Sequence, residues 1–200
     1  MSKHQFILAH YPEAKKALKS SGIPPLFALA QAALESGWGK HAPGNMLFGI
    51  KIGKGANYGG WNGKKQLITT TEYYQFPNKK YQYIYPAYPM RTVSGNWKYK
   101  IKDEFRAYDS IEDSFKDWAG LLKNNLCYRK AFQYSKDPYR FALAIAEAGY
   151  ATDPNYVVKI HRLMDSIKKE LTIYKVAYKG LLPLVVISIG IITIVYYFNY

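Results

Sequence analysis

Two glutamates lie in surroundings that suit acid–base chemistry on a sugar. Glu35 ends the apolar segment LFALAQAALE, directly before Ser36-Gly37-Trp38-Gly39. Burial against apolar neighbours raises the pKa of a carboxyl group, because the charged form loses hydration. A raised pKa suits a general acid that protonates a glycosidic oxygen, and Trp38 offers a flat apolar wall for a sugar ring. The spacing alone equally supports a glutamate that is simply hydrated at a helix C-terminus.

Glu72 is the second candidate, in the strand-like run TTTEYY. An acid in such a run either prevents pairing at a sheet edge or projects a functional group, and the local sequence favours the first reading. Seven of the other carboxylates are explained as hydrated groups on helix faces or as helix caps. These are Glu13, Glu112, Asp113, Glu170, Asp109, Asp137 and Asp153.

Other reactive centres have little support in the sequence. The single cysteine, Cys127, cannot form an internal disulfide or a cysteine-based zinc site. It also lacks a histidine and asparagine context for a nucleophile, so a buried or incidental thiol is the simpler reading. The histidines at 4, 10, 41 and 161 do not have HExxH spacing. We therefore expect no metal and no cofactor.

The elements that must position these groups are mainly helical. Pro24-Pro25 starts a predicted helix over 25–36, with proline in its first turn, and glycines 37 and 39 end this helix. Residues 40–65 form a glycine-rich loop, residues 66–76 a strand, and residues 97–108 its returning partner in a hairpin. Further helices are predicted over 111–125, 139–148 and 154–171, behind the caps Asp109-Ser110, Asp137-Pro138 and Asp153-Pro154. The fold class is mainly α (α+β), without βαβ alternation.

Composition narrows the class of protein and of partner. The 200 residues include 28 Lys and Arg against 14 Asp and Glu, a net charge of +14, and 48% are hydrophobic. That much apolar material excludes a disordered acidic chain. The positive charge either solubilises the surface or attracts nucleic acid, anionic lipid or an anionic cell-wall polymer.

The C-terminal segment has a different character. Residues 181–198 read LLPLVVISIGIITIVYYF, without a charge. At about 1.5 Å per residue this segment nearly spans a hydrocarbon core of about 30 Å, and basic and aromatic residues flank it. Because residues 1–22 show no signal peptide, we expect a tail-anchored protein with a domain over 1–172, a basic juxtamembrane linker over 173–180 and a transmembrane helix over 181–198. A buried core helix is the alternative, and the positive-inside tendency would place the domain on the cytoplasmic side.

Five segments in order carry a family resemblance. AQAALESGWGK, NMLFGIK, TTTEY, FRAYDS and AGYATDPNYVVKI resemble the glucosaminidase family of peptidoglycan hydrolases, glycoside hydrolase family 73, over residues 5–170. The resemblance implies a lysozyme-like, mostly α domain with a cleft between helices and a mobile β-hairpin lobe. It also implies hydrolysis of the β-1,4 bond between N-acetylglucosamine and N-acetylmuramic acid.

The resemblance gives roles to individual residues. Glu35 matches the general acid, Glu72 the acidic partner on the hairpin, and Tyr150 a tyrosine that positions the substrate N-acetyl group. Asp117 falls where an acid is implicated in some members, and we interpret it as structural. The positions that commonly line the cleft are Trp38, Asn45, Phe48 and Trp61.

The sequence leaves several alternatives open. Residues 73–104 make a longer hairpin than the family's usual one, interpreted as an aromatic and basic lid or as a surface excursion. A lytic transglycosylase shares the fold but needs no second carboxylate, and an inactive wall-binding module would not need either. A membrane-attached nucleic-acid binder explains the charge but none of the five motifs, so we expect no nucleic acid. The anchor suits a bacterial wall-remodelling enzyme or a phage lysin held in a bacterial or virion membrane.

Overall fold

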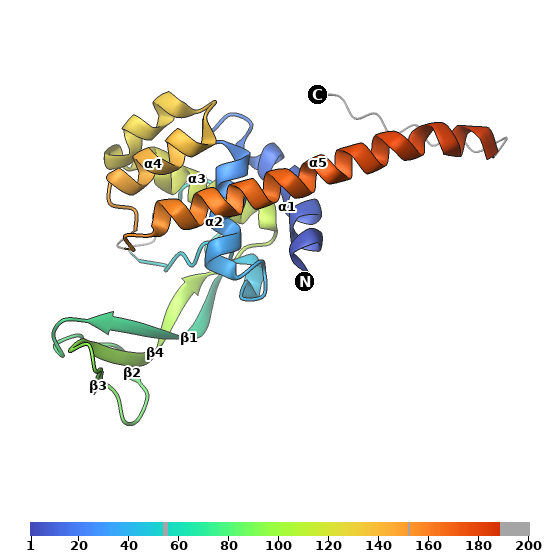
Figure 1. The fold of residues 1–200 in the computed structure, drawn as a ribbon. Helices are drawn as coiled ribbons and strands as arrows, with labels where there is room; N and C mark the ends of the chain where they lie inside the picture. The colour runs from blue at the N-terminus through green and yellow to red at the C-terminus, as the bar shows by residue number, and fades with distance from the viewer. Residues whose placement is uncertain (54–55, 152, 189–200) are drawn as a thin grey trace.

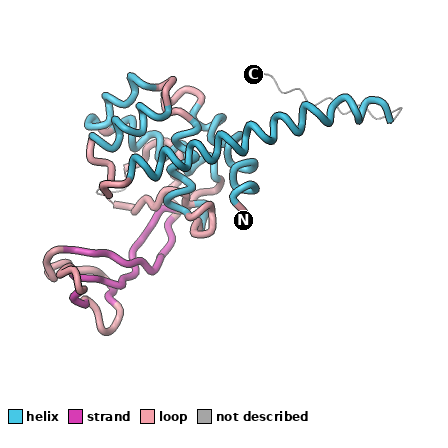
Figure 2. The backbone as a smooth tube through the Cα atoms, in the orientation of Figure 1, coloured by secondary structure: helices cyan, strands magenta, loops and turns pink. Residues whose placement is uncertain are grey.

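The computed structural model describes residues 1–53, 56–151 and 153–188, which form a helical body and a projecting β-lobe (Figure 1). The helices gather in the body and all the strands lie in the lobe (Figure 2). The α-helices are α1 (Lys3–Leu18), α2 (Pro25–Ser36), α3 (Ile111–Asn124), α4 (Pro138–Glu147) and α5 (Tyr156–Ser188), and the 3-10 helices are η1 (Pro43–Asn45) and η2 (Leu126–Tyr134). The strands are β1 (Lys65–Tyr74), β2 (Tyr83–Ile84), β3 (Met90–Arg91) and β4 (Trp97–Arg106).

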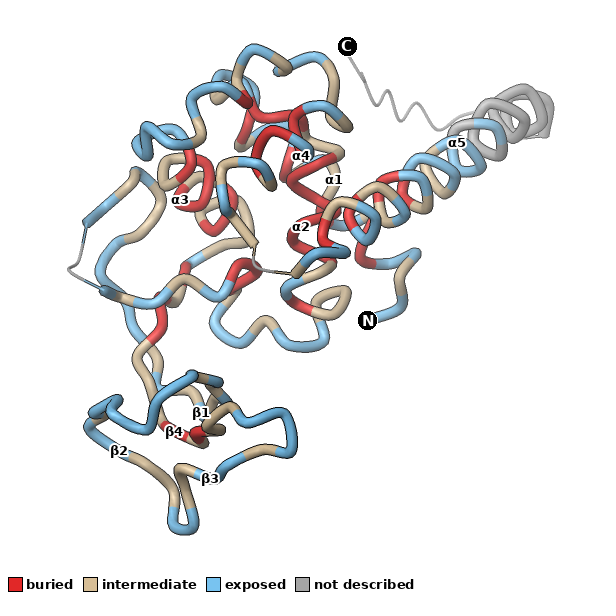
Figure 3. The backbone as a smooth tube through the Cα atoms, turned by 60° about the vertical axis from the view of Figure 1, so that its left-hand side comes forward, coloured by how far each residue is buried: buried red, intermediate tan, exposed pale blue. Residues whose placement is uncertain are grey.

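Helix α2 is the centre of the body, as its composition predicts. Every residue from Phe27 to Ala33 is buried, and α1, α4 and α5 all pack against the helix. A helix that is apolar all round must be surrounded, and its alanines let the neighbouring helices approach closely. Most of the buried residues lie in the helical body, and few lie in the lobe (Figure 3).

Two of the three predicted helix caps are confirmed, those of α3 and α4. At the start of α3, the side chain of Ser110 accepts a hydrogen bond from the backbone N–H of Asp113 at 3.1 Å. At the start of α4, Asp137 accepts from the backbone N–H groups of Tyr139 and Arg140, both at 3.1 Å. These caps satisfy backbone donors that have no partner inside the helix.

The predicted hairpin is confirmed, and the long segment between its strands completes a sheet. β1 and β4 pair antiparallel from Lys65↔Arg106 to Tyr74↔Trp97. β2 and β3 pair with the other edge of β4, so β4 is central. Tyr99 is 1% exposed and packs edge-on against Tyr74 and Tyr81, which gives the lobe a small aromatic core of its own. Residues 73–104 thus contribute two short strands to the sheet besides the ends of the hairpin.

The base of the lobe is fixed to α3 by a buried ion pair. Nη1 of Arg106 donates to both carboxylate oxygens of Asp117 at 2.9 Å, and the hydroxyl of Tyr108 donates to the same carboxylate at 2.7 Å. The loop ahead of β1 also lies directly on α3, since a Cβ at Gly120 would collide with the carbonyl oxygen of Tyr58. Asp117 therefore supports the structure, as the sequence indicated.

Helix α5 begins in the core and then leaves it. Tyr156, Ile160, Met164 and Ile167 are buried at helical spacing. The helix continues through residues 173–180, the segment predicted as a linker, to Ser188. Of the predicted transmembrane segment 181–198, residues 189–198 lie outside the described residues. Within the part of the chain that the structure describes, no helix has an apolar stretch long enough to cross a membrane.

Candidate active site

Glu35 lies in the last turn of α2, where the helix ends at an open surface. Gly37 ends the helix in the left-handed conformation, with φ 57°. The Glu35 residue is exposed to solvent, as a group that meets a substrate must be. Protein atoms still crowd its carboxyl group, and this partial desolvation raises the pKa of Glu35, against the opposing effect of a hydrogen bond from Gln31.

Gln31 joins Glu35 to two tyrosines. Its side chain is fully buried, one helical turn before Glu35, and Nε2 donates to Oε1 of Glu35 at 2.8 Å. The same nitrogen lies 3.4 Å from the hydroxyl of Tyr150, while Oε1 of Gln31 accepts from the hydroxyl of Tyr156 at 2.7 Å. Because hydrogen bonds engage both the oxygen and the nitrogen of this amide, the amide has one orientation. Gln31 therefore fixes the position of the Glu35 carboxyl group from the buried side.

Tyr150 has its hydroxyl oxygen occupied by donors. Gln31 donates to it, and Nε1 of Trp118 donates at 3.0 Å. The hydroxyl proton of Tyr150 is therefore directed away from these two groups. Burial raises the pKa of Tyr150, so the hydroxyl keeps its proton at neutral pH. The side chain thus offers a fixed neutral O–H donor on the same network as Glu35.

Glu72 lies in the lobe, within an ion-pair network. Nζ of Lys51 is 2.9 Å from Oε1 of Glu72 and 2.9 Å from Oδ2 of Asp103. Partial burial acts to lower the pKa of Lys51, but the two carboxylates outweigh it and raise the pKa overall. The backbone of Lys51 also pairs with Phe105 at the base of β4. A loop of the helical body therefore fixes the inner side of the lobe beside Glu72.

The residues predicted to line a cleft pack against other side chains or form hydrogen bonds with the backbone. Phe48 is buried and stacks on Trp118, with ring centroids 4.5 Å apart. Trp38 packs edge-on against Phe6. Nδ2 of Asn45 donates to the carbonyl oxygen of Tyr108 at 3.0 Å.

Trp61 covers the guanidinium of Arg106, 4.4 Å from its ring centroid. Among the contacts of the described residues, none joins Trp38, Asn45 or Trp61 to the Glu35 network, and none joins Glu72 to Glu35.

Several residues of the site were not predicted. Gln31 had a signal in the sequence, since it is a polar residue one turn before Glu35 in an otherwise apolar helix. Trp118, Tyr156 and Lys51 had none, because their roles depend on contacts between distant segments. No group of three or more potential metal ligands occurs among the residues that the structure describes.

Comparisons with known proteins show the family to which the chain belongs. A family model described as "Glucosaminidase: Mannosyl-glycoprotein endo-beta-N-acetylglucosaminidase" matches residues 11–169. The chain is 34% identical over 180 residues to the peptidoglycan hydrolase FlgJ of Vibrio cholerae, covering 87% of this chain and 46% of that protein. It is 33% identical over 172 residues to a probable N-acetylmuramidase of Lactococcus lactis, covering 82% and 33%. The chain thus spans less than half the length of these two relatives.

Solved structures share the fold. The glycoside hydrolase domain of Salmonella typhimurium FlgJ matches with a TM-score of 0.68 and 29% identity, over 92% of this chain and 99% of that one. A peptidoglycan hydrolase from Sphingomonas sp. A1 matches with a TM-score of 0.58 and 34% identity, over 84% and 93%. The predicted lysozyme-like class, mainly helical with a small β-lobe, is confirmed for the described residues.

Proposed function

Because the chain belongs to the glucosaminidase family, we propose that it is a peptidoglycan hydrolase that cleaves the β-1,4 bond between N-acetylglucosamine and N-acetylmuramic acid. The observation that carries the proposal is the Glu35 carboxyl group. It is accessible, its pKa is raised by partial burial, and buried Gln31 fixes its position beside Tyr150.

The residues divide the work of hydrolysis. Protonated Glu35 donates its proton to the glycosidic oxygen as the bond breaks. Tyr150 donates its hydroxyl proton in a hydrogen bond to the carbonyl oxygen of the substrate N-acetyl group. Glu72 supplies a negative charge on the lobe, which activates water or stabilises the developing oxocarbenium ion. The ion pair with Lys51 sets the position of that carboxylate.

The direct test is mass spectrometry of borohydride-reduced products from purified peptidoglycan, with the full chain and its Glu35→Gln variant. New reduced N-acetylglucosamine ends that disappear in the variant support the proposal. Reduced N-acetylmuramic acid ends would still show a hydrolase, but one that cleaves the other glycosidic bond of the glycan strand. Anhydro ends would identify a lytic transglycosylase, and intact polymer that retains the protein would leave a wall-binding module.

We also propose that residues 181–198 anchor the protein in a bacterial or virion membrane, on the strength of their uncharged sequence. The full chain should float with lipid vesicles in a density gradient. A fragment of residues 1–172 should stay in solution and remain active, because it keeps the buried contacts of Ile160, Met164 and Ile167. A full chain that stays out of the lipid fraction, or an inactive fragment, would refute this division of the chain.

A further inference from the structure

The β-lobe has two faces of different character. Residues directly opposite each other on paired strands share a face, so Thr69, Thr71 and Tyr73 of β1 lie with Lys102, Lys100 and Lys98 of β4. Tyr83 of β2 pairs with Lys102, and Tyr85 follows at the level of Lys100. We call this set the outer face. Glu72 belongs to the opposite, inner face, with Tyr99 and Asp103.

The outer face carries a row of lysines without acidic partners. Lys98, Lys100 and Lys102 alternate along β4, so neighbouring members are about 6.6–6.8 Å apart along the strand. In the part of the chain that the structure describes, no ion pair involves any of the three. In contrast, Lys65 at the end of the same face pairs with Glu104 at 2.6 Å. The row therefore presents unneutralised charge.

Two tyrosines contact two of the three lysines in this row. Nζ of Lys100 lies 5.0 Å from the ring centroid of Tyr85, and Nζ of Lys102 lies 5.3 Å from that of Tyr83. The hydroxyl of Tyr85 reaches across β4 to Oγ1 of Thr69 at 2.9 Å, which fixes its ring. Because ammonium groups cover the rings, a ligand meets charge rather than a bare stacking surface. This arrangement suits repeated anions better than stacked nucleobases.

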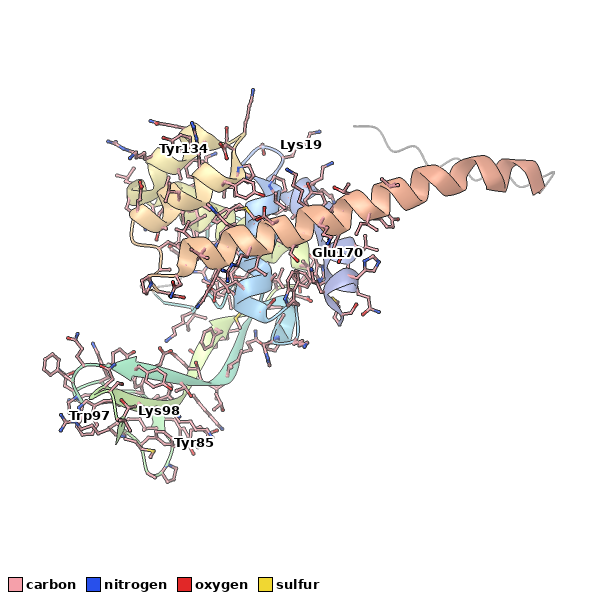
Figure 4. All side chains as sticks on the ribbon, viewed as in Figure 1. Lys19, Tyr85, Trp97, Lys98, Tyr134 and Glu170 are labelled. Carbon is pink, nitrogen blue, oxygen red and sulfur yellow. The ribbon has the colours of Figure 1, made fainter. Side chains whose placement is uncertain are left out.

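We propose that the outer face binds the carboxylates of a peptidoglycan strand next to the strand being cleaved. The inference rests on the proposed function, and its ligand is the repeated carboxylate groups of the stem peptides. Under the proposed function the strand being cleaved meets Glu72, which lies on the inner face, so a ligand on the opposite face is a different strand. Figure 4 shows Lys98 and Tyr85 in the lobe, away from the helical body. The lobe thereby keeps the enzyme within the polymer network between cleavage events.

The test compares two triple variants of the full chain that remove equal charge. One is Lys98→Gln/Lys100→Gln/Lys102→Gln. The control is Lys19→Gln/Lys123→Gln/Lys136→Gln, on exposed lysines of the helical body; Lys19 lies at the end of the body away from the lobe (Figure 4). Binding is measured by co-sedimentation in a Glu35→Gln background, which leaves the polymer intact. The probe is peptidoglycan stripped of phosphate polymers, with its carboxyl groups either free or amidated.

We expect the outer-face variant to bind free-carboxyl peptidoglycan about tenfold more weakly than the unsubstituted lobe, because three ion contacts at half-buried lysines are lost, and the control to change less than about twofold. The difference should vanish on amidated peptidoglycan and shrink as salt rises from about 0.05 to about 0.3 M. Equal binding by the two variants, or a difference that persists after amidation, would overturn the inference. A difference seen only with phosphate-bearing walls or with a single-stranded oligonucleotide would also overturn it.

A second measurement separates this inference from the proposed function. Hydrolysis of short glycan fragments without stem peptides uses only the cleft. With Glu35 present, the outer-face variant should cleave these fragments at the rate of the control. An unsubstituted chain that fails to cleave them would count against the proposed function, whatever the binding result; a selective loss of cleavage in the outer-face variant would count against the inference.

Discussion

Replacing Gln31 with methionine removes one hydrogen-bond donor from Glu35 and keeps a side chain of similar length. Nε2 of Gln31 donates to Oε1 of Glu35 at 2.8 Å, which stabilises the charged carboxylate and lowers the pKa of Glu35 relative to burial alone. A general acid works only when protonated, so activity falls as the pH rises through its pKa. Loss of the donor raises that pKa, and the descending limb of the pH–rate profile moves to higher pH.

The size of the effect follows from the bond that is lost. A hydrogen bond to a charged group contributes about 1.5–3 kcal/mol, and water replaces part of this at an exposed carboxyl such as Glu35. About 1.4 kcal/mol is a factor of ten in a protonation equilibrium. At pH values well above the descending limb of the unsubstituted enzyme, we therefore expect Gln31→Met to increase the protonated fraction of Glu35 by at most about tenfold.

The assay is the pH dependence of kcat/KM for solubilisation of peptidoglycan. Tyr156→Phe is the matched control, because it removes the hydroxyl that donates to Gln31 at 2.7 Å but leaves the bond to Glu35. Its descending limb should stay in place. Gln31→Met leaves the buried Tyr156 hydroxyl without its acceptor at a cost of about 1–3 kcal/mol, which the double variant recovers. A limb that stays fixed or moves to lower pH in Gln31→Met would refute the reasoning.

Three further predictions concern the frame around the site. Asp117→Asn leaves the guanidinium of Arg106 buried without a counter-charge, so urea unfolding should show a loss of about 3–5 kcal/mol; a loss below about 1 kcal/mol would contradict this. Gly120→Ala forces a Cβ into the carbonyl oxygen of Tyr58 and should cost about 1–3 kcal/mol by the same measurement, whereas an unchanged unfolding midpoint would contradict that close approach. Lys51→Met removes two partly exposed ion pairs and should change stability by less than about 1 kcal/mol. It should still lower kcat on peptidoglycan, because the lobe carboxylate loses its anchor; an unchanged kcat would show that Lys51 has no positioning role.

Elements with strong local signals could be predicted from the sequence. The helix over Pro25–Ser36 has prolines at its start, a continuous apolar run and a glycine at its end. The pairing of β1 with β4 follows from two runs rich in β-branched and aromatic residues. Glu13 was assigned to a helix face, but the bounds of helix α1 were not predicted, because Pro12 lies inside it and removes a backbone donor that a regular helix uses.

The site could be predicted only in part, because residue types do not determine which distant segments come into contact. Glu35 and Tyr150 were both candidates. Gln31 joins them by hydrogen bonds to each, and this connection depends on residues far apart in the chain. Phe48 has the aromatic character expected of a cleft wall, yet its ring stacks in the core on Trp118. A buried amide or ring chooses its neighbours by tertiary packing, which leaves no local signal.

The uninterrupted course of α5 has a mechanical consequence for a membrane-held enzyme. From Ile167, the last buried residue among those described, to the proposed anchor at Leu181, the chain is helical. At about 1.5 Å per residue that stretch is a stiff rod of about 20 Å. If the proposed anchor inserts in a membrane, such a rod would set both the distance of Glu35 from the bilayer and the direction in which Glu35 faces. Each inserted residue would turn the catalytic domain by about 100° about the rod. The length of this helix would therefore set how far into the wall, and in which direction, the enzyme reaches its substrate. A flexible linker would set neither.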